Sequence, residues 1–167
     1  MIYKKDSRSI TDLNPEFKIK VERFLNKLDK ENIKYVVYFT TRSLETQAYL
    51  WRAGRTKSLI NKTIASLRKN KRVWVATLIE NARPNPEPKI LTNALPGGSS
   101  HNYGYGLDIV PIDSNKLPLW DYRKNKGIYK RMAAIGKTCG LAWGGSWVIF
   151  KGDYCHFEEP KWKKLIG

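Results

Sequence analysis

The stretch SSHNYGYGLD (residues 99–108) decides how the middle of the chain folds. The stretch runs into a largely apolar segment, residues 107–112, which predicts a strand. His101 and Asp108 are seven residues apart, so an unbroken strand would point them to opposite faces. Gly104 and Gly106 permit a turn between them, because glycine tolerates conformations closed to other residues. We therefore predict that His101 ends a loop, that Asp108 begins a strand, and that both can face one point.

The chain contains only one other histidine, His156, within KGDYCHFE (residues 151–158). Two imidazoles and one carboxylate suit a catalytic zinc site, in which three protein ligands leave the fourth position to water. Taken alone, each histidine is more commonly a surface or core residue, and an Asp before an apolar strand is commonly a turn residue. Spacing alone therefore leaves the metal site and the ordinary structural roles both open.

Helical signals occur in four other parts of the chain. Asn14-Pro15 begins one helix, whose apolar positions recur at spacings of three and four, at Phe17, Val21, Phe24, Leu25 and Leu28. Ser43 caps a second helix that runs to about Trp51 and stops at Gly54. Residues 57–82 have an irregular helical pattern, and residues 125–138 predict a helix with Ile128, Met132 and Ile135 on one face.

Strands and loops fill the remaining segments. Residues 35–40 are β-branched or aromatic and predict a buried strand. Residues 83–88 are rich in proline and, with residues 93–100, predict loops. The glycine- and aromatic-rich residues 143–157 predict short strands and turns. Helices mixed with short strands, without a βαβ rhythm, indicate an α+β domain.

The 167 residues suit one compact domain, and 41% hydrophobic with 28% charged residues is ordinary for a globular protein. The start of the chain has no apolar run of the length that a signal peptide needs, and no segment reaches the roughly 20 apolar residues of a membrane span. We expect synthesis as a soluble cytoplasmic protein. Cys139 and Cys155 match no metal-binding spacing, so we expect two reduced thiols, with a disulfide between them left open.

The chain is strongly basic, with 31 Lys and Arg against 15 Asp and Glu and a net charge of +16. Such a charge attracts polyanions, and nucleic acid is the first candidate. Bacterial envelope polymers are polyanionic too, and the basic residues are scattered instead of forming one stripe. The charge alone therefore selects neither class of partner.

Several motifs resemble those of the zinc peptidoglycan peptidases, the family of D-alanyl-D-alanine carboxypeptidases and dipeptidases and of L-alanyl-D-glutamate endopeptidases. SSHNYGYGLD is similar to that family's SxHxxGxAxD, and DYCHFE (153–158) to its second signature, an acid three residues before a His-Phe-Glu. TRSLETQAYL (41–50) with GRT (54–56), TNA (92–94) and WGGSW (143–147) also fit, best with phage endolysins of the endopeptidase branch. The resemblance spans residues 12 to 160. Gly106 replaces an alanine, Thr41 a tyrosine, and Cys155 an aromatic residue or proline.

The resemblance implies an α+β fold with a small central antiparallel sheet flanked by helices, and a role for each matching residue. His101, Asp108 and His156 would bind Zn²⁺. Asp153 would be the general base that passes a proton to the leaving amine, and Arg42 would stabilise the oxyanion. Gln47 and Ser99 would orient ligands or substrate. A turn role for Asp153, a surface ion pair for Arg42 and structural roles for Gln47 and Ser99 remain the alternatives.

We therefore expect residues 1–167 to form a single catalytic domain, without a separate wall-binding domain, that acts as a monomer. It would cut the peptide stem of peptidoglycan between L-alanine and D-glutamate. Its role would be to lyse the host of a phage. It would be made in the host cytoplasm and act on the wall after release. The alternatives are a D-alanyl-D-alanine carboxypeptidase, an inactive zinc-containing relative, and a nucleic-acid-binding module, against which the absence of a reader motif argues.

Overall fold

A four-stranded antiparallel sheet lies at the centre of the computed structural model, which describes residues 2, 5–148 and 152–166. The strand order is β1-β2-β4-β3, and β2 is buried along its whole length. The bounds of the four strands are β1 Tyr35–Phe39, β2 Gly106–Pro111, β3 Ala142–Trp143 and β4 His156–Glu158. The predicted α+β fold with a small central antiparallel sheet is confirmed.

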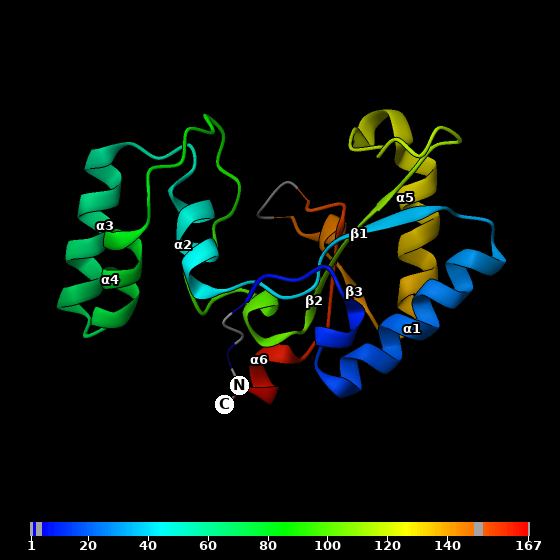
Figure 1. Cartoon of the computed structure of the whole chain (residues 1–167), viewed down its shortest axis with the longest axis horizontal. Coiled ribbons are helices and arrows are strands. Elements are labelled where there is room, and N and C mark those ends of the chain that lie inside the picture. The colour runs from blue at the N-terminus through cyan, green and yellow to red at the C-terminus, as the bar shows by residue number, and fades with distance from the viewer. Residues whose placement is uncertain (1, 3–4, 149–151, 167) are drawn as a thin grey trace.

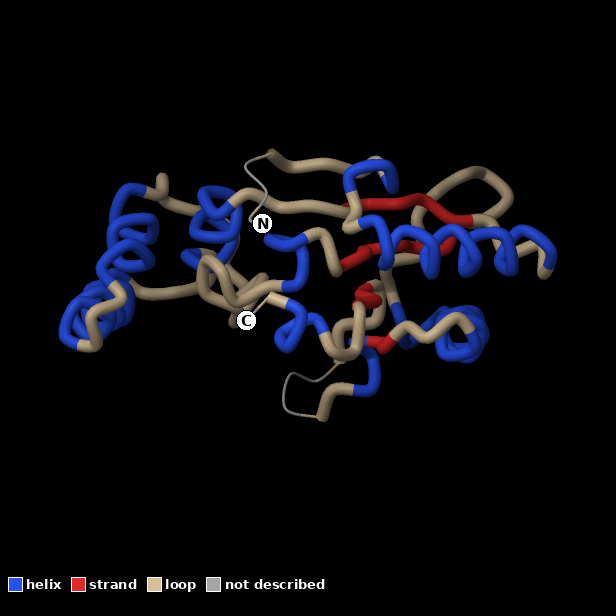
Figure 2. The backbone as a smooth tube through the Cα atoms, turned by 90° about the horizontal axis from the view of Figure 1, so that it is seen from below, coloured by secondary structure: helices blue, strands red, loops and turns tan. Residues whose placement is uncertain are grey.

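The helices gather in two places (Figures 1 and 2). The two longest ones lie with the sheet at one end of the molecule, and three others form a helical lobe at the opposite end. The first group comprises α1 Pro15–Lys30 and α5 Tyr122–Thr138, and the lobe comprises α2 Leu44–Arg52, α3 Lys57–Lys69 and α4 Val73–Asn81. A short helix, α6 Trp162–Leu165, follows the last strand. None of the described helices combines the length and apolar character that a membrane crossing needs.

The main core forms where α1 and α5 meet the sheet. Asn14 caps α1 by accepting a hydrogen bond from the Glu16 amide, and Pro15 occupies the first turn, where its missing N–H costs nothing. The apolar face predicted from the sequence is the buried face: Phe24 packs its ring 4.9 Å from that of Phe157 on β4. Cys139 lies in this core, and both cysteines are free thiols as expected.

The helical lobe has a small core of its own. The irregular helical pattern over residues 57–82 corresponds to two helices, because the chain turns back at residues 70–72, with Lys71 in a left-handed conformation (φ 59°). The apolar side chains of this core come from all three helices, namely Ala48, Trp51, Ile60, Ile64, Leu67, Val75, Ala76 and Ile79. Apolar contacts within the lobe thus hold α2 in place independently of the sheet.

The expectation of a buried strand at residues 35–40 is wrong in one respect. β1 pairs with β2 on one side only, so it is an edge strand of the described sheet. Its side chains are only partly buried, and Tyr38 is 37% exposed. The apolar sequence of a strand does not reveal whether that strand will lie at the edge of the sheet, with only one neighbouring strand.

The packing of α1 predicts a large stability difference between its two faces. Phe24→Ala should lower the free energy of unfolding by about 3–5 kcal/mol, because it leaves a cavity against Phe157. Ile19→Ala, at a position 57% exposed on the same helix, should change it by less than about 0.5 kcal/mol. Urea unfolding followed by circular dichroism measures both values, and equal losses would contradict this description of the core.

Candidate metal centre

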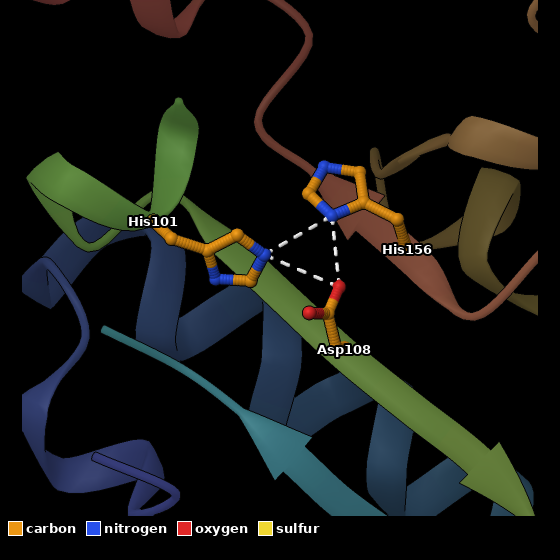
Figure 3. Close-up of side chains that lie close together, drawn as sticks. All are labelled: His101, Asp108 and His156. Atoms are coloured by element: carbon orange, nitrogen blue, oxygen red, sulfur yellow. Dashed lines mark hydrogen bonds and ion pairs between the residues drawn. The ribbon is translucent and has the colours of Figure 1, made fainter. Parts of the chain in front are cut away.

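Three buried side chains, His101, Asp108 and His156, converge on one point (Figure 3). His101 Nε2 lies 3.2 Å from Asp108 Oδ1 and 3.2 Å from His156 Nδ1. The third side of the triangle, from His156 Nδ1 to Asp108 Oδ1, measures 3.0 Å. The structure therefore brings together the three residues predicted as zinc ligands, which are distant along the sequence.

The backbone between His101 and Asp108 breaks where the sequence predicted. A 3-10 helix, Ser100–Tyr103, carries His101 and ends at Gly104, whose conformation is left-handed (φ 71°, ψ 23°). β2 begins at Gly106, and a Cβ atom there would lie only 2.7 Å from Ser100 Oγ and 2.9 Å from His101 Nδ1. Glycine at 106 therefore lets the imidazole lie against the strand that carries Asp108.

His156 reaches the site through the sheet. It is the first residue of β4, and its partner across the β2–β4 ladder is Asp108. Directly paired residues on antiparallel strands project to the same face of a sheet. Strand pairing alone thus places two of the three donors side by side.

Hydrogen bonds orient both imidazole rings through the nitrogen atom of each ring that does not face the shared point. His101 Nδ1 lies 3.1 Å from the Thr40 carbonyl oxygen, so this nitrogen carries the proton and donates it. His156 Nε2 lies 3.1 Å from Glu158 Oε2 and 3.4 Å from Ser100 Oγ. These contacts leave His101 Nε2 and His156 Nδ1 facing the shared point, the arrangement typical of metal-binding histidines.

The charges around the site favour a bound cation. Burial lowers the pKa of His101, although the nearby Asp108 carboxylate acts in the opposite sense. Burial also opposes a charge on Asp108, but the charge and hydrogen bond of His101 and the hydrogen bond of His156 outweigh it, so the pKa of this carboxyl lies well below its ordinary value. For His156, burial opposes the charged form, but hydrogen bonds with Asp108 and Glu158 and the charges of Asp108 and Asp153 raise its pKa to about 10.

The donor set and its dimensions fit zinc. Two imidazole nitrogens and a carboxylate oxygen form a common catalytic zinc set, and zinc lies about 2.0–2.1 Å from such donors in a tetrahedron whose edges are then about 3.3–3.4 Å. The three donor atoms are 3.0–3.2 Å apart, close to those edges. Three ligands leave one corner of the tetrahedron open, as catalysis requires.

Arg42 lies beside the triangle and not on the open surface. Its Nη2 donates to Asp108 Oδ2 at 3.3 Å, and its Nη1 donates to Gln47 Oε1 at 3.0 Å. Gln47 is fully buried and donates through Nε2 to the Ala94 carbonyl oxygen at 2.8 Å. Gln47 therefore connects Arg42 to the loop that precedes His101, and the guanidinium is held against the second oxygen of a proposed ligand.

Asp153 and Ser99 occupy different positions relative to the site. Asp153 precedes β4, where its carboxylate accepts a hydrogen bond from Cys155 Sγ at 3.3 Å and its charge acts on His156. Ser99 starts the 3-10 helix without a side-chain cap, and within the described part of the chain it is the neighbouring Ser100 whose hydroxyl lies near His156. The roles of Asp153, Arg42, Gln47 and Ser99 stay predictions.

Ser100 and Glu158 were not among the site residues predicted from the sequence. Both side chains approach His156 Nε2 in the structure. Glu158 could be found by its spacing, because residues i and i+2 of a strand share a face. Ser100 had no such signal, since its contact depends on how the 3-10 helix packs against β4.

A family model described as D-alanyl-D-alanine carboxypeptidase matches residues 92–159, the segment that contains all three candidate ligands and Asp153. The peptidoglycan L-alanyl-D-glutamate endopeptidase CwlK of Bacillus subtilis (strain 168) is 27% identical over 153 residues, which cover 89% of this chain and 74% of that protein. By these matches the chain is similar to the zinc peptidoglycan peptidases, as the sequence motifs indicated.

Several solved structures of peptidoglycan peptidases share the fold of this chain. The L-Ala D-Glu endopeptidase ChiX of Serratia marcescens superposes with a TM-score of 0.52 at 15% identity, over 97% of this chain and 93% of that one. A variant of the vancomycin resistance D,D-pentapeptidase VanY in complex with Zn(II) also gives 0.52 at 13% identity, over 99% and 85%. The LdcB LD-carboxypeptidase gives 0.52 at 15% identity over 92% of this chain, which spans 63% of that one.

The hydrogen bonds behind His156 predict how strongly its neighbours affect metal binding. Glu158→Ala should weaken zinc binding by about 10–100-fold, because it removes the acceptor that orients the ligand ring. Glu159→Ala is the matched control, since that carboxylate accepts from Lys20 Nζ at 2.6 Å instead. Competition with a chromophoric chelator measures both affinities, and an equal effect of the two variants would refute the assigned role of Glu158.

Proposed function

We propose that this protein is a peptidase that hydrolyses the peptide stem of bacterial peptidoglycan between L-alanine and D-glutamate. The buried His101–Asp108–His156 triangle, with an open corner for a reacting group, is the observation that supports hydrolysis most directly. The name of the Bacillus relative favours the L-alanyl-D-glutamate bond. The matched family model favours its alternative, the terminal D-alanyl-D-alanine bond.

His101 and His156 would bind the zinc ion through Nε2 and Nδ1, and Asp108 through Oδ1. When bound, zinc lowers the pKa of water to about 7 and polarises a carbonyl oxygen. Thr40 and Glu158 hold the two rings in the tautomers that this binding needs. The second oxygen of Asp108, Oδ2, accepts a hydrogen bond from Arg42. The carboxylate would therefore bind the metal through Oδ1 alone.

Asp153 would accept the proton of the attacking water and deliver it to the nitrogen of the leaving amine. Its position three residues before His156, with its charge acting on that ring, supports this role. Arg42 would stabilise the oxyanion that develops on the scissile carbonyl, since guanidinium N–H groups are strong donors in a site from which water is largely excluded. Gln47 would keep Arg42 in place, and Ser99 would contact the substrate.

The biological setting that we propose is host lysis by a bacteriophage. The protein would be made in the host cytoplasm and would reach the wall after release, with its net charge of +16 concentrating it on anionic envelope polymers. A single short catalytic domain that works as a monomer would suffice. A specific role in nucleic-acid binding is not needed to explain the charge.

Digestion of purified peptidoglycan tests the proposed catalysis. Asp153→Ala should lose activity by about 100-fold or more while it retains zinc, because general acid–base catalysis contributes at least this much. His156→Ala should lose both activity and zinc. Turbidity of the wall suspension and metal content by mass spectrometry give the two readouts, and chelator-treated wild type restored with zinc is the control.

The products decide which bond is cut. Cleavage between L-alanine and D-glutamate creates a new amino group on D-glutamate, whereas the alternative reaction releases free D-alanine. Labelling of new amino termini, followed by chromatography, separates the two outcomes. If Asp153→Ala remained fully active, the assignment of the general base would be wrong whichever bond is cut.

The charge also leads to a prediction. Reversal of three exposed lysines, Lys161, Lys163 and Lys164, to glutamate should weaken binding to purified walls more at low salt than at high salt, because salt screens exposed charges. Reversal of Lys124, Lys126 and Lys130 should have a similar effect if scattered charge acts as a whole. Cosedimentation at two salt concentrations measures this, and a loss independent of salt would disprove an electrostatic origin.

A further inference from the structure

Four aromatic side chains, Tyr38, Trp120, Tyr122 and Tyr154, form an aromatic surface close to the metal centre. Trp120 lies edge-on to Tyr38 with ring centroids 4.9 Å apart. The rings of Tyr122 and Tyr154 are stacked in parallel, 3.5 Å apart. A pocket of about 420 Å³ opens over this surface, and its lining residues are Trp120, Asp121, Tyr122, Arg123 and Tyr154.

An irregularity in β1 turns Tyr38 towards this surface. The pairing of β1 with β2 shifts between Val37 and Phe39, so that Tyr38 is an additional residue and Phe39 pairs with Asp108. Such bulges change the direction of a side chain, often beside active sites. The rings of Tyr38 and Phe39 consequently contact each other at 5.6 Å, and the Phe39 ring lies 6.5 Å from that of His101.

The other end of the aromatic surface is also close to a candidate ligand, in this case along the sequence. Tyr154 is two residues before His156, in the segment that leads into β4. Ring contacts therefore connect Trp120 to His101 through Tyr38 and Phe39, and the stacked pair of Tyr122 and Tyr154 continues the surface to the His156 side. A substrate held at the metal would extend over this surface.

The exposed rings suit a sugar. Trp120 is 50% exposed and is the more accessible ring, whereas Tyr38 is 37% exposed and has the Arg8 guanidinium 4.9 Å from its ring centroid. Aromatic rings with polar edges bind partners that have one apolar and one polar side, and the carbon-bound hydrogens on one face of a pyranose ring form such an apolar side. Asp121 and Arg123 border the same pocket, where they can bind hydroxyl or acetamido groups. The pocket volume lies within the range of about 300–1,000 Å³ of small-molecule sites.

We propose that this aromatic surface binds the N-acetylated sugar to which the stem peptide is attached. The inference rests on the proposed function and favours one bond over the other. L-Alanine joins the stem to the sugar, so the sugar is one residue from the L-alanyl-D-glutamate bond, and an extended residue spans only about 3.3–3.6 Å. The D-alanyl-D-alanine bond is at the far end of the stem, where a neighbouring sugar subsite would be of no use.

Two substrates with and without the sugar test the proposal. Trp120→Ala should lower kcat/KM about tenfold for a disaccharide-linked stem peptide, as expected for the loss of one aromatic contact, and leave kcat/KM for the sugar-free stem peptide within about twofold of wild type. Trp74→Ala is the matched control, because Trp74 is 49% exposed on α4 in the helical lobe. It should affect neither substrate.

Binding of tri-N-acetylchitotriose to the zinc-loaded protein, followed by NMR titration, provides a readout independent of catalysis. Wild type and Trp74→Ala should bind this sugar, and Trp120→Ala should bind it about tenfold more weakly. Equal losses of kcat/KM on both substrates, no loss on either, or unchanged sugar binding in Trp120→Ala would overturn the proposal. Failure of the proposed function would look different: wild type would cleave neither substrate, and the chitotriose titration alone would then decide the sugar surface.

Discussion

The site depends on how one buried carboxylate, that of Asp108, is satisfied. Its Oδ1 faces both imidazoles and its Oδ2 accepts from Arg42, so each oxygen has a partner of complementary charge or polarity. A buried acid without such partners would be costly, whereas one surrounded by donors stays ionised. Asp108 can therefore be buried on β2. This requires that the elements carrying His101, His156 and Arg42 all meet at Asp108.

The two parts of the fold contribute different things to that meeting point. The sheet supplies Asp108 and His156 by strand pairing, and the 3-10 helix supplies His101 after the turn at Gly104. The helical lobe supplies Gln47, whose bonds to Arg42 and to Ala94 join the beginning of α2 to the loop before His101. The lobe thus has a role in the site although none of its residues is a candidate ligand.

Local patterns predicted what local forces determine. The apolar spacing of α1, the cap at Ser43 and the glycine break between His101 and Asp108 all follow from neighbours in sequence, and the structure contains each of them. The edge position of β1, the displacement of Tyr38 by a bulge and the contact of Ser100 with His156 depend on segments far away in the chain. No pattern within one segment reports such contacts, so the surroundings of the site could not be predicted as well as its candidate ligands.

The balance of charge explains how so basic a protein can hold a dication. Asp108, Glu158 and Asp153 all act on His156, while Arg42 is the permanently charged group that the described contacts bring to Asp108. When both imidazoles are neutral, as metal binding requires, these three carboxylates and one guanidinium leave two negative charges unbalanced, the number that Zn²⁺ carries. Short-range fields dominate inside the protein, since burial reduces screening there, whereas the +16 of the whole chain acts through solvent on distant polyanions. An acidic metal site inside a basic surface is therefore electrostatically consistent, and each can serve a different partner.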